Sequence, residues 1–168
     1  QEAEKYGLCK EKTGSFSIKD STTGYILITP SQVSRSDLKP ENICIVDMDG
    51  KTIETENNKN PSREILLHLE IYNQKKNVKA VMYAHSLYAT IFAVANKVIP
   101  PIVADSSHYG GYIYVAPYEK AQTIELAKSV IGPLSKNDVC LLERHGVVIT
   151  SEKIDEILTK ARYVEDVA

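Results

Sequence analysis

The sequence predicts a layered α/β or α+β domain with a mixed β-sheet. Three observations lead to this prediction: two hairpin signals lie in the first third of the chain, later strand-like runs alternate with helical patterns, and neither an internal repeat nor a low-complexity tract is visible. A chain of 168 residues can bury a full core, so one domain spanning 1–168 is expected. The chain begins at Gln1 without Met and stops inside a helical pattern, and we therefore expect trimmed ends.

The first third is rich in β-forming residues. The runs GSFSIKD at 14–20 and GYILITP at 24–30 are separated only by STT, which is typical of a β-hairpin. Asp49-Gly50 stands between the apolar runs of NICIVDMDGKTIET and is the strongest short hairpin signal in the chain. This region therefore predicts two successive hairpins.

Helical periodicity begins after this region. Ser62 is expected to cap a helix whose apolar face consists of Ile65, Leu66, Leu69 and Tyr72. A strand at 78–84 then runs into a second helix at 86–97, and a glycine-rich loop follows at 106–118.

The last third is expected to contain a helix at 120–131, stopped by Gly132-Pro133, and one strand at 139–150. Ser151 then caps a final helix with one apolar face, made by Ile154, Ile157, Leu158, Ala161 and Val164.

Composition excludes several classes of function. Lys and Arg number 20 against 22 Asp and Glu, a net charge of −2, and no block of like charge suggests nucleic acid or an anionic membrane as partner. The longest apolar tract, 88–104, is interrupted by Asn96, Lys97 and two prolines, so no membrane span is expected. The cysteines are far apart and odd in number, as in a reduced cytoplasmic protein; they are Cys9, Cys44 and Cys140.

Three side chains are candidates for a metal-dependent site. Glu64 falls in the first turn of its predicted helix, where the helix dipole and the free amide groups stabilise a carboxylate. His68 lies one turn further on and would pair with it. His85 follows a buried-looking strand, and His145 precedes Gly146 in an apolar strand; each alone is typical of a core or capping histidine. A Glu and two His can also bind a divalent metal and leave positions open for substrate. The residues by themselves leave both interpretations open.

Taken together, six segments resemble the class II aldolase/adducin family: TGSFSIKD, ILITPSQV, PSREILLHLEIY, AVMYAHSLYAT, LLERHGVVI and ARYVEDVA. This family includes fuculose-phosphate and rhamnulose-phosphate aldolases, ribulose-phosphate 4-epimerases and the non-enzymatic head domain of adducin. The resemblance implies a three-layer α/β/α domain with a central mixed, mainly antiparallel sheet. It also implies a homotetramer with active sites between neighbouring subunits. Function must still be argued from the site itself.

The resemblance implies a metal site with one ligand lost. Family aldolases bind zinc through a His-x-His pair and a third histidine before a glycine, while a Glu after a serine acts as acid/base and can ligate the metal. His85 matches the second of the pair, His145 the third histidine, and Glu64 the Glu, but Tyr83 stands where the first histidine would be. A phenol with a pKa near ~10 is a poor ligand unless the metal deprotonates it. Zinc, or another divalent metal, on Glu64, His85 and His145 is therefore implied, with its retention left open.

The implied phosphate region is also altered. The family places Gly-Asn-x-Ser, Thr-Pro-Ser-Gly and Ser-Ser segments around the phosphate, and here Ser15, Gln32 and Arg63 replace the Asn, the second Gly and one Ser. Arg63 can either pair with a phosphate or carboxylate or fill the pocket. The implied phosphate-binding residues are Ser17, Thr29, Ser31, Ser62 and Arg63. Without the family context, these hydroxyls would be ordinary turn and cap groups.

The proton donor is the third feature in which the sequence differs from the family pattern. The family tyrosine that protonates the enediolate falls at Ala104 in this chain. His108 and Tyr109, in the glycine-rich loop, are the alternative candidates for a general acid or base, although loop residues of this kind are commonly just exposed.

Two classes of function follow. The first is an aldolase-like lyase, or a 4-epimerase-like isomerase, acting on a small phosphorylated sugar or hydroxy-carbonyl compound, in which a metal stabilises an enediolate and Glu64 moves the proton. The second is a non-catalytic, adducin-like oligomeric scaffold, with the apolar loop 109–118 available for subunit contacts. The enzyme is favoured, because selection for the fold alone would not require Glu64, His85 and His145 together.

Overall fold

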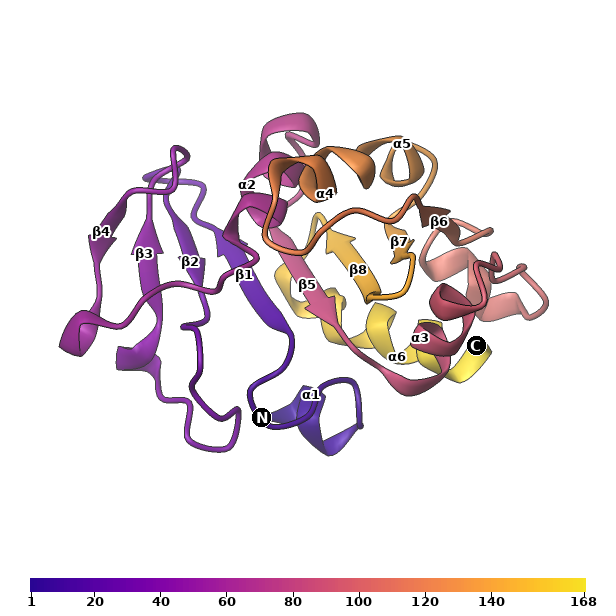
Figure 1. The fold of residues 1–168 in the computed structure, drawn as a ribbon, viewed down its shortest axis with the longest axis horizontal. Coiled ribbons are helices and arrows are strands. Elements are labelled where there is room, and N and C mark those ends of the chain that lie inside the picture. The colour runs from indigo at the N-terminus through magenta and orange to yellow at the C-terminus, as the bar shows by residue number, and fades with distance from the viewer.

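The computed structural model describes residues 1–168 apart from the side chain of Asn57. Its centre is an eight-stranded sheet in the order β4-β3-β2-β1-β5-β8-β7-β6 (Figure 1). Neighbouring strands are antiparallel except β6 and β7, which are parallel, so the expected mixed, mainly antiparallel sheet is confirmed. The strands are β1 Ser15–Lys19, β2 Ile26–Ile28, β3 Cys44–Val46, β4 Thr52–Glu54, β5 Ala80–Ala84, β6 Tyr114–Ala116, β7 Val139–Leu142 and β8 Gly146–Ser151.

Helices cover both faces of the sheet and complete the expected three layers. One apolar core lies under α2, α4 and α5, and a second lies under α1, α3 and α6 (Figure 1). The helices are α1 Glu2–Lys5, α2 Ile65–Gln74, α3 Leu87–Val94, α4 Ile124–Ser129, α5 Ile131–Leu134 and α6 Ile157–Val167. Short 3-10 turns are η1 Pro40–Asn42, η2 Glu56–Asn58, η3 Ala104–His108 and η4 Ile154–Glu156.

Strand β5 links the two cores. Its side chains alternate between the faces, so Val81 and Tyr83 join the core under α2, while Met82 and Ala84 join the core under α3. Burial on both faces explains why this strand is an uninterrupted apolar run. Tyr83 is therefore directed to the α2 side at the end of the strand.

Both predicted hairpins are confirmed. Strands β1 and β2 pair antiparallel with Ser17 opposite Ile28, and β3 pairs with β4 across the turn that contains Asp49-Gly50. In that turn the carboxylate of Asp47 accepts the backbone N–H groups of Asp49 and Lys51, which holds the turn closed.

The predicted single strand at 139–150 is wrong, because two strands occupy this segment. β7 and β8 pair antiparallel, and Arg144, at φ 57°, turns the chain between them. Only three residues separate two apolar runs, so the sequence reads as continuous. The segment 106–118, expected to be a loop, contains β6.

Several helix boundaries also differ from prediction. α4 begins only at Ile124, where Thr123 caps it by accepting the Leu126 N–H, and Gly132-Pro133 lie inside α5 instead of ending a helix. α2 begins at Ile65, after Glu64, while the Ser62 hydroxyl accepts the Glu64 N–H.

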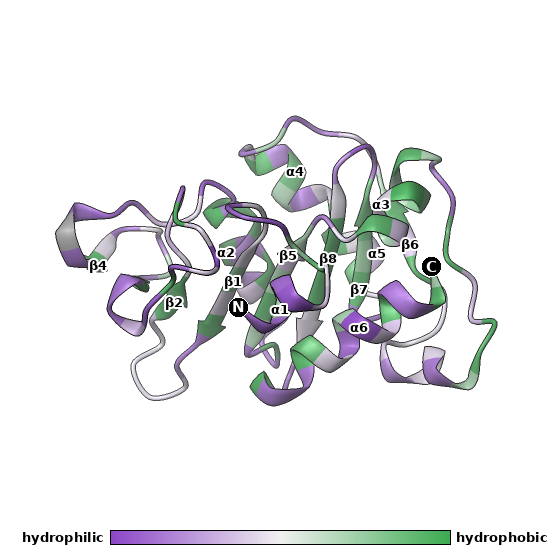
Figure 2. Ribbon diagram, turned by 90° about the horizontal axis from the view of Figure 1, so that it is seen from below, coloured by the Kyte–Doolittle hydropathy of each residue, from purple (hydrophilic) through white to green (hydrophobic). Residues whose placement is uncertain are grey.

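The predicted apolar faces are partly correct. On α2, Leu69 and Tyr72 are buried, but Leu66 is 38% exposed and His68 is buried in its stead. Ser151, the predicted cap of the last helix, belongs to β8. Ile154 lies before α6 and is 47% exposed, whereas Ala161 and Val164 lie on α6 and are buried as expected. Figure 2 shows that α3 is hydrophobic along most of its length, whereas α6 is mixed. None of the helices in the described part of the chain has the length and hydropathy needed to cross a bilayer.

Candidate active site

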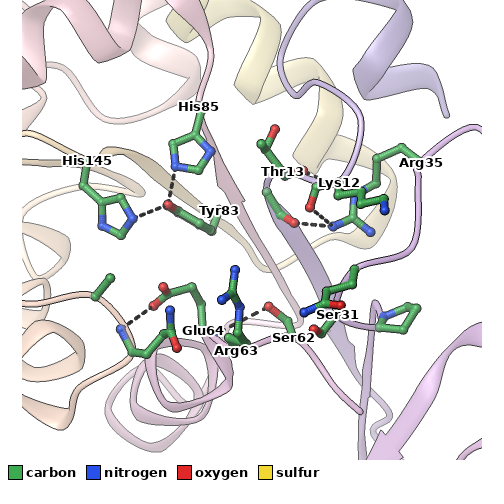
Figure 3. A pocket seen from close by; sticks show the side chains of 15 residues that line it. Lys12, Thr13, Ser31, Arg35, Ser62, Arg63, Glu64, Tyr83, His85 and His145 are labelled. Carbon is green, nitrogen blue, oxygen red and sulfur yellow. Dashed lines mark hydrogen bonds between the residues drawn. The ribbon is translucent and has the colours of Figure 1, made fainter. Parts of the chain in front are cut away.

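A cavity of about 300 Å³ opens on the α2 side of the sheet, where the end of β5 meets the turn between β7 and β8. Figure 3 shows side chains from distant parts of the sequence around it. Its walls are residues 12–14, 30–32, 62–64 and 121–122, together with Arg35, Tyr83, His85 and His145. Glu64, His85 and His145, predicted to meet, therefore line one cavity.

At one end of the cavity, a tyrosine lies between two histidines. The Tyr83 hydroxyl oxygen is 2.5 Å from the Nε2 atom of His85 and 2.5 Å from that of His145 (Figure 3). The pairing of Ala84 with Val147 brings the end of β5 beside the start of β8, and this places the two histidines together. We name Tyr83, His85 and His145 the tyrosine–histidine cluster.

Gly146 permits this close approach. A Cβ atom at this position would lie 2.4 Å from the Ala84 carbonyl oxygen and 3.2 Å from the His85 ring. A side chain would therefore push the β7–β8 turn away from β5, and with it His145 away from Tyr83.

The hydrogen bonds of the cluster fix the tautomers of its imidazoles. The phenol has one hydrogen, so it donates to one ring and accepts from the N–H of the other. The Nδ1 atom of His85 is buried without a partner in the described part of the chain, and an unpaired buried N–H is rarer than an unfilled acceptor. We therefore assign the hydrogen of His85 to Nε2, which donates to Tyr83, while Tyr83 donates to Nε2 of His145.

All three groups of the cluster are held neutral. Burial lowers the pKa of His85, and burial together with the neighbouring His85 lowers the pKa of His145. Burial, with a smaller contribution from the charge of Glu64, raises the pKa of the Tyr83 phenol. The phenol therefore stays protonated at neutral pH.

These side chains do not fit the implied zinc site. Among the described residues, no group of three or more His, Cys, Asp or Glu side chains is placed to hold a metal ion. Zinc would lie about 2.0–2.1 Å from each imidazole nitrogen, but the protonated phenol of Tyr83 occupies the space between the two rings. Glu64, His85 and His145, the expected ligand set, share a cavity, but Tyr83 fills the position between the two imidazoles.

Glu64 faces the same cavity from the residue before α2. The residue is 8% exposed, and its carboxylate accepts the backbone N–H of Gln122 at 3.2 Å. Burial raises the pKa of this carboxyl group, while the Gln122 N–H and the charge of Arg63 oppose the rise. A carboxyl group poised in this way can take up and return a proton.

The opposite end of the cavity is cationic and rich in hydroxyl groups. Lys12, Ser31, Ser62 and Arg63 line it, and Arg35 lies behind residues 12–14 (Figure 3). Of the five implied phosphate-binding residues, Ser31, Ser62 and Arg63 are therefore placed around the cavity.

Ser17 and Thr29 do not line the cavity. The buried Ser17 hydroxyl bonds to Nδ1 of His68 at 2.7 Å and to the Tyr72 hydroxyl at 2.8 Å, so it helps to attach α2 to the sheet. The Thr29 hydroxyl accepts the N–H of Phe16 at 3.1 Å. Both hydroxyls serve the fold, which corrects the expectation that they bind phosphate.

His68 likewise has a structural role. It was expected to pair with Glu64, but its Nε2 atom bonds to the Ser15 hydroxyl at 2.7 Å and its Nδ1 atom to Ser17. Complete burial lowers its pKa to about 3.

His108 and Tyr109 lie on the other side of the sheet, in the layer of α6. His108 is exposed and stacks on Tyr163 with ring centroids 4.6 Å apart, and Tyr109 is fully buried with its hydroxyl donating to Ser106. Neither lines the cavity within one chain, because η3 packs them toward α6, so this expectation is also corrected for the single chain.

Sequence reasoning missed Lys12, Arg35 and Gln122. Lys12 directly precedes Thr13, the first residue of the family-like segment TGSFSIKD, which is the one available signal. Gln122 was assigned to a helix, whereas it adopts φ 67° just before α4. Arg35 contacts backbone carbonyls, which leave no pattern in the sequence.

Comparison with known proteins gives the chain a family. The profile of the Class II Aldolase and Adducin N-terminal domain matches residues 1–168. An L-fuculose phosphate aldolase of Methanococcus vannielii is 33% identical over 155 residues, covering 92% of this chain and 81% of the relative. A 5-deoxy-D-ribulose 1-phosphate aldolase of Bacillus thuringiensis is 30% identical over 159 residues, covering 95% and 74%.

Solved structures agree with this result. An L-fuculose 1-phosphate aldolase superposes with a TM-score of 0.93 at 26% identity, covering 99% of this chain and 77% of that one. The L-fuculose-1-phosphate aldolase of Thermus thermophilus superposes with a TM-score of 0.82 at 28% identity, covering 99% and 83%. The chain belongs to the class II aldolase and adducin N-terminal domain family.

Proposed function

We propose that this chain is an aldolase-type lyase that binds a small phosphorylated sugar or hydroxy-carbonyl compound. The observation that carries the proposal is the polarity of the cavity: Glu64 and the tyrosine–histidine cluster face one end, and cationic and hydroxyl groups line the other. The names of the relatives are consistent with it, because both the fuculose phosphate and the deoxyribulose phosphate aldolases are named for phosphorylated ketoses.

The cationic end is suited to the phosphate of such a substrate. Arg63 offers a guanidinium group that can bind phosphate through two parallel hydrogen bonds, and Lys12 adds a second positive charge. The hydroxyl groups of Ser31 and Ser62 complete the set of donors. A phosphate held here would direct the carbon chain toward Glu64 and Tyr83.

The proton steps of a lyase can be assigned to groups at the other end. Cleavage of a carbon–carbon bond beside a hydroxyl releases the hydroxyl proton, yields an aldehyde, and leaves the bond electrons on the second fragment as an enediolate. Glu64 takes the hydroxyl proton and returns a proton to the enediolate carbon. The charge on the enediolate oxygen is met by the Tyr83 hydroxyl, which turns its hydrogen from His145 to the ligand.

Turnover of ketose 1-phosphates tests this function. A panel that includes fuculose 1-phosphate and 5-deoxyribulose 1-phosphate is incubated with the protein, and the aldehyde product is measured. We expect Glu64→Gln to lower turnover by about 10²–10⁴-fold, the range for a general acid or base. Glu70→Gln is the matched control, because Glu70 lies on α2, outside the cavity wall, and its carboxylate accepts an exposed hydrogen bond from Gln74. Equal turnover by wild type and Glu64→Gln would contradict the proposal.

A specific observation favours a second candidate, a non-catalytic scaffold of the adducin type. In the tyrosine–histidine cluster the Tyr83 hydroxyl pairs with both imidazoles and occupies the space between them. A scaffold would turn over no member of the panel, and neither Glu64→Gln nor Arg63→Met would change its assembly.

We also propose that the chain forms a homo-oligomer, most simply a tetramer. Four apolar side chains of α3 are about half exposed or more: Leu87 54%, Tyr88 54%, Ile91 54% and Val94 60%. In the following segment Ile102 is 70% exposed, and in the loop 109–118 Tyr112 and Tyr118 are exposed as well. Large apolar side chains exposed to this extent along one helix are typical of a protein interface.

Light scattering tests the assembly. Wild type should show a multiple of the 18.7 kDa chain mass at micromolar concentration, and Ile91→Lys should shift the equilibrium toward the monomer. Ile53→Lys is a matched control, because Ile53 is 45% exposed on the edge strand β4 and lies outside the proposed surface. A wild-type monomer would contradict the proposal.

A further inference from the structure

Arg35 is a buried cation that has no carboxylate within ion-pair distance, and the charge of Glu4 acts on it only from farther away. Arg35 belongs to the cavity wall, beside residues 12–14, and is only 2% exposed. No carboxylate of the described residues lies within 4.0 Å of its guanidinium group, and its Nη1 atom has no hydrogen-bond partner. Burying a charge is costly unless it is paired, so a site for a compensating anion is expected nearby.

The guanidinium group holds the loop that forms one wall of the cavity. Its Nε atom donates to the Thr13 carbonyl at 3.3 Å, and its Nη2 atom donates to the carbonyls of Lys12 at 3.3 Å and Gly14 at 2.5 Å. The backbone N–H of Arg35 also donates to Glu11 at 2.9 Å. One residue thus binds four successive carbonyl groups.

This clamp determines where the loop presents an N–H group. In a trans peptide the N–H points opposite to the carbonyl, so the Gly14 N–H points away from Arg35 when the Thr13 carbonyl points toward it. In the described part of the chain the Gly14 N–H has no partner, and Gly14 lines the cavity. Glycine is required here, because φ is 75° and a Cβ would lie 2.8 Å from the Tyr83 carbonyl oxygen.

The side chains around the cavity also carry more positive than negative charge. Lys12, Arg35 and Arg63 are cationic, and Glu64 is the one carboxylate in the cavity wall that the structure describes. Glu64 lies at the opposite end, where its carboxylate accepts the Gln122 N–H. A bound dianion would therefore meet two facing cations, a free N–H and the buried charge of Arg35 behind them.

Resting on the function proposed above, we propose that Arg35 is a positioning residue for a dianionic phosphate group of the ligand. It shapes residues 12–14 so that the Gly14 N–H and Lys12 face the cavity, and its buried charge is balanced by the bound phosphate. It acts through the loop and through its electric field, since its own Nη1 atom is buried. A ligand with a phosphate monoester is thereby favoured over one with a single carboxylate.

Inorganic phosphate is the probe, measured by calorimetry on the intact chain near pH 8, with acetate as a monoanion. We expect Arg35→Met to weaken phosphate binding by about 10-fold to 100-fold, the range for lost charge-assisted hydrogen bonds. Arg35→Lys keeps the charge but cannot hold three carbonyl groups, and it should fall between wild type and Arg35→Met. Arg162→Met is the control, because that guanidinium stacks 4.1 Å from the Tyr6 ring centroid and is exposed.

Thermal melts separate this role from a purely structural one. Phosphate should raise the melting temperature of wild type and Arg162→Met, but that of Arg35→Met much less. Arg35→Met that binds phosphate as tightly as wild type, or wild type that prefers acetate, would overturn the proposal. If Arg35→Met does not fold, equal phosphate affinity of Arg35→Lys and wild type overturns it. Phosphate affinity is read without turnover, so a failed lyase assay leaves this test intact.

Discussion

The two ends of the cavity differ in how their polar groups are satisfied. At the tyrosine–histidine cluster the groups satisfy one another, with the Tyr83 hydroxyl 2.5 Å from each imidazole. At the cationic end Arg35 has an unpaired Nη1 atom and the Gly14 N–H has no partner in the described part of the chain. The comparison teaches that the groups of the first end bond to one another and leave only Nδ1 of His85 unpaired, whereas the second end leaves a cationic nitrogen and a backbone N–H unpaired and is suited to an anionic ligand.

The cluster also depends on close backbone packing, and each end of the cavity contains a residue in the left-handed backbone region. Gly146 must lack a side chain for the β7–β8 turn to approach β5. Gln32 and Gln122 both line the cavity with φ above 60°, a conformation that non-glycine residues rarely adopt. Strain of this kind is commonly concentrated at functional sites.

The largest expected effect concerns the core beneath the cavity. His68 has a pKa of about 3 in the folded protein and about 6.5 in the unfolded chain. Between these pH values only the unfolded chain binds the proton. The contribution of His68 to the free energy of unfolding is therefore fully present above pH 6.5 and falls by about 1.4 kcal/mol per pH unit below it. From pH 6.5 to 5 the loss should be about 2 kcal/mol.

Chemical denaturation at several pH values measures this loss. His68→Gln retains hydrogen-bonding groups for Ser15 and Ser17 but does not titrate, so its stability should change less over the same interval. Parallel curves for the two proteins would show that His68 is not the buried neutral imidazole described above.

A second prediction tests whether the tyrosine–histidine cluster depends on the close backbone contact at Gly146. Gly146→Ala should lower the free energy of unfolding by about 1–3 kcal/mol, since overpacking of a close contact costs that much, and the added Cβ would lie 2.4 Å from the Ala84 carbonyl oxygen. Gly132→Ala is the control, because a Cβ there meets no atom within 4 Å and α5 accommodates it. Equal melting temperatures of Gly146→Ala and wild type would argue against the packing requirement.

The smallest expected effect concerns backbone strain at the cationic end of the cavity. Gln32→Gly should raise the free energy of unfolding by about 0.5–1 kcal/mol, because the left-handed conformation costs about 1–2 kcal/mol and the greater backbone entropy of glycine offsets part of it. Urea denaturation of both proteins measures the difference. A less stable variant would mean that the Gln32 side chain contributes packing that outweighs the strain at φ 62°.

The sequence allowed the fold and half of the site to be predicted. Asp49-Gly50 specifies its turn locally, and the family-like segments placed Glu64, His85 and His145 around one cavity. These predictions succeed because they depend on residue types at fixed spacing.

The remaining site residues depend on contacts between distant segments. Ser17 alternates onto the correct face of β1, but α2 covers it with His68, and nothing near Ser17 in the sequence announces that partner. Arg35 binds backbone carbonyls, which every residue has, so no particular side chain signals its role. The effect of Tyr83 depends on an atomic distance that spacing alone cannot supply.

The most direct test of the central comparison is a zinc titration by calorimetry, run in parallel on wild type and Tyr83→His. If the phenol completes the cluster, wild type binds zinc weakly or not at all, and Tyr83→His, with three imidazoles, binds it at least about 10-fold more tightly. Tyr83→Phe serves as the control, because it opens the hydrogen bonds without adding a ligand. Stoichiometric zinc binding by wild type that Tyr83→His does not strengthen would contradict the account.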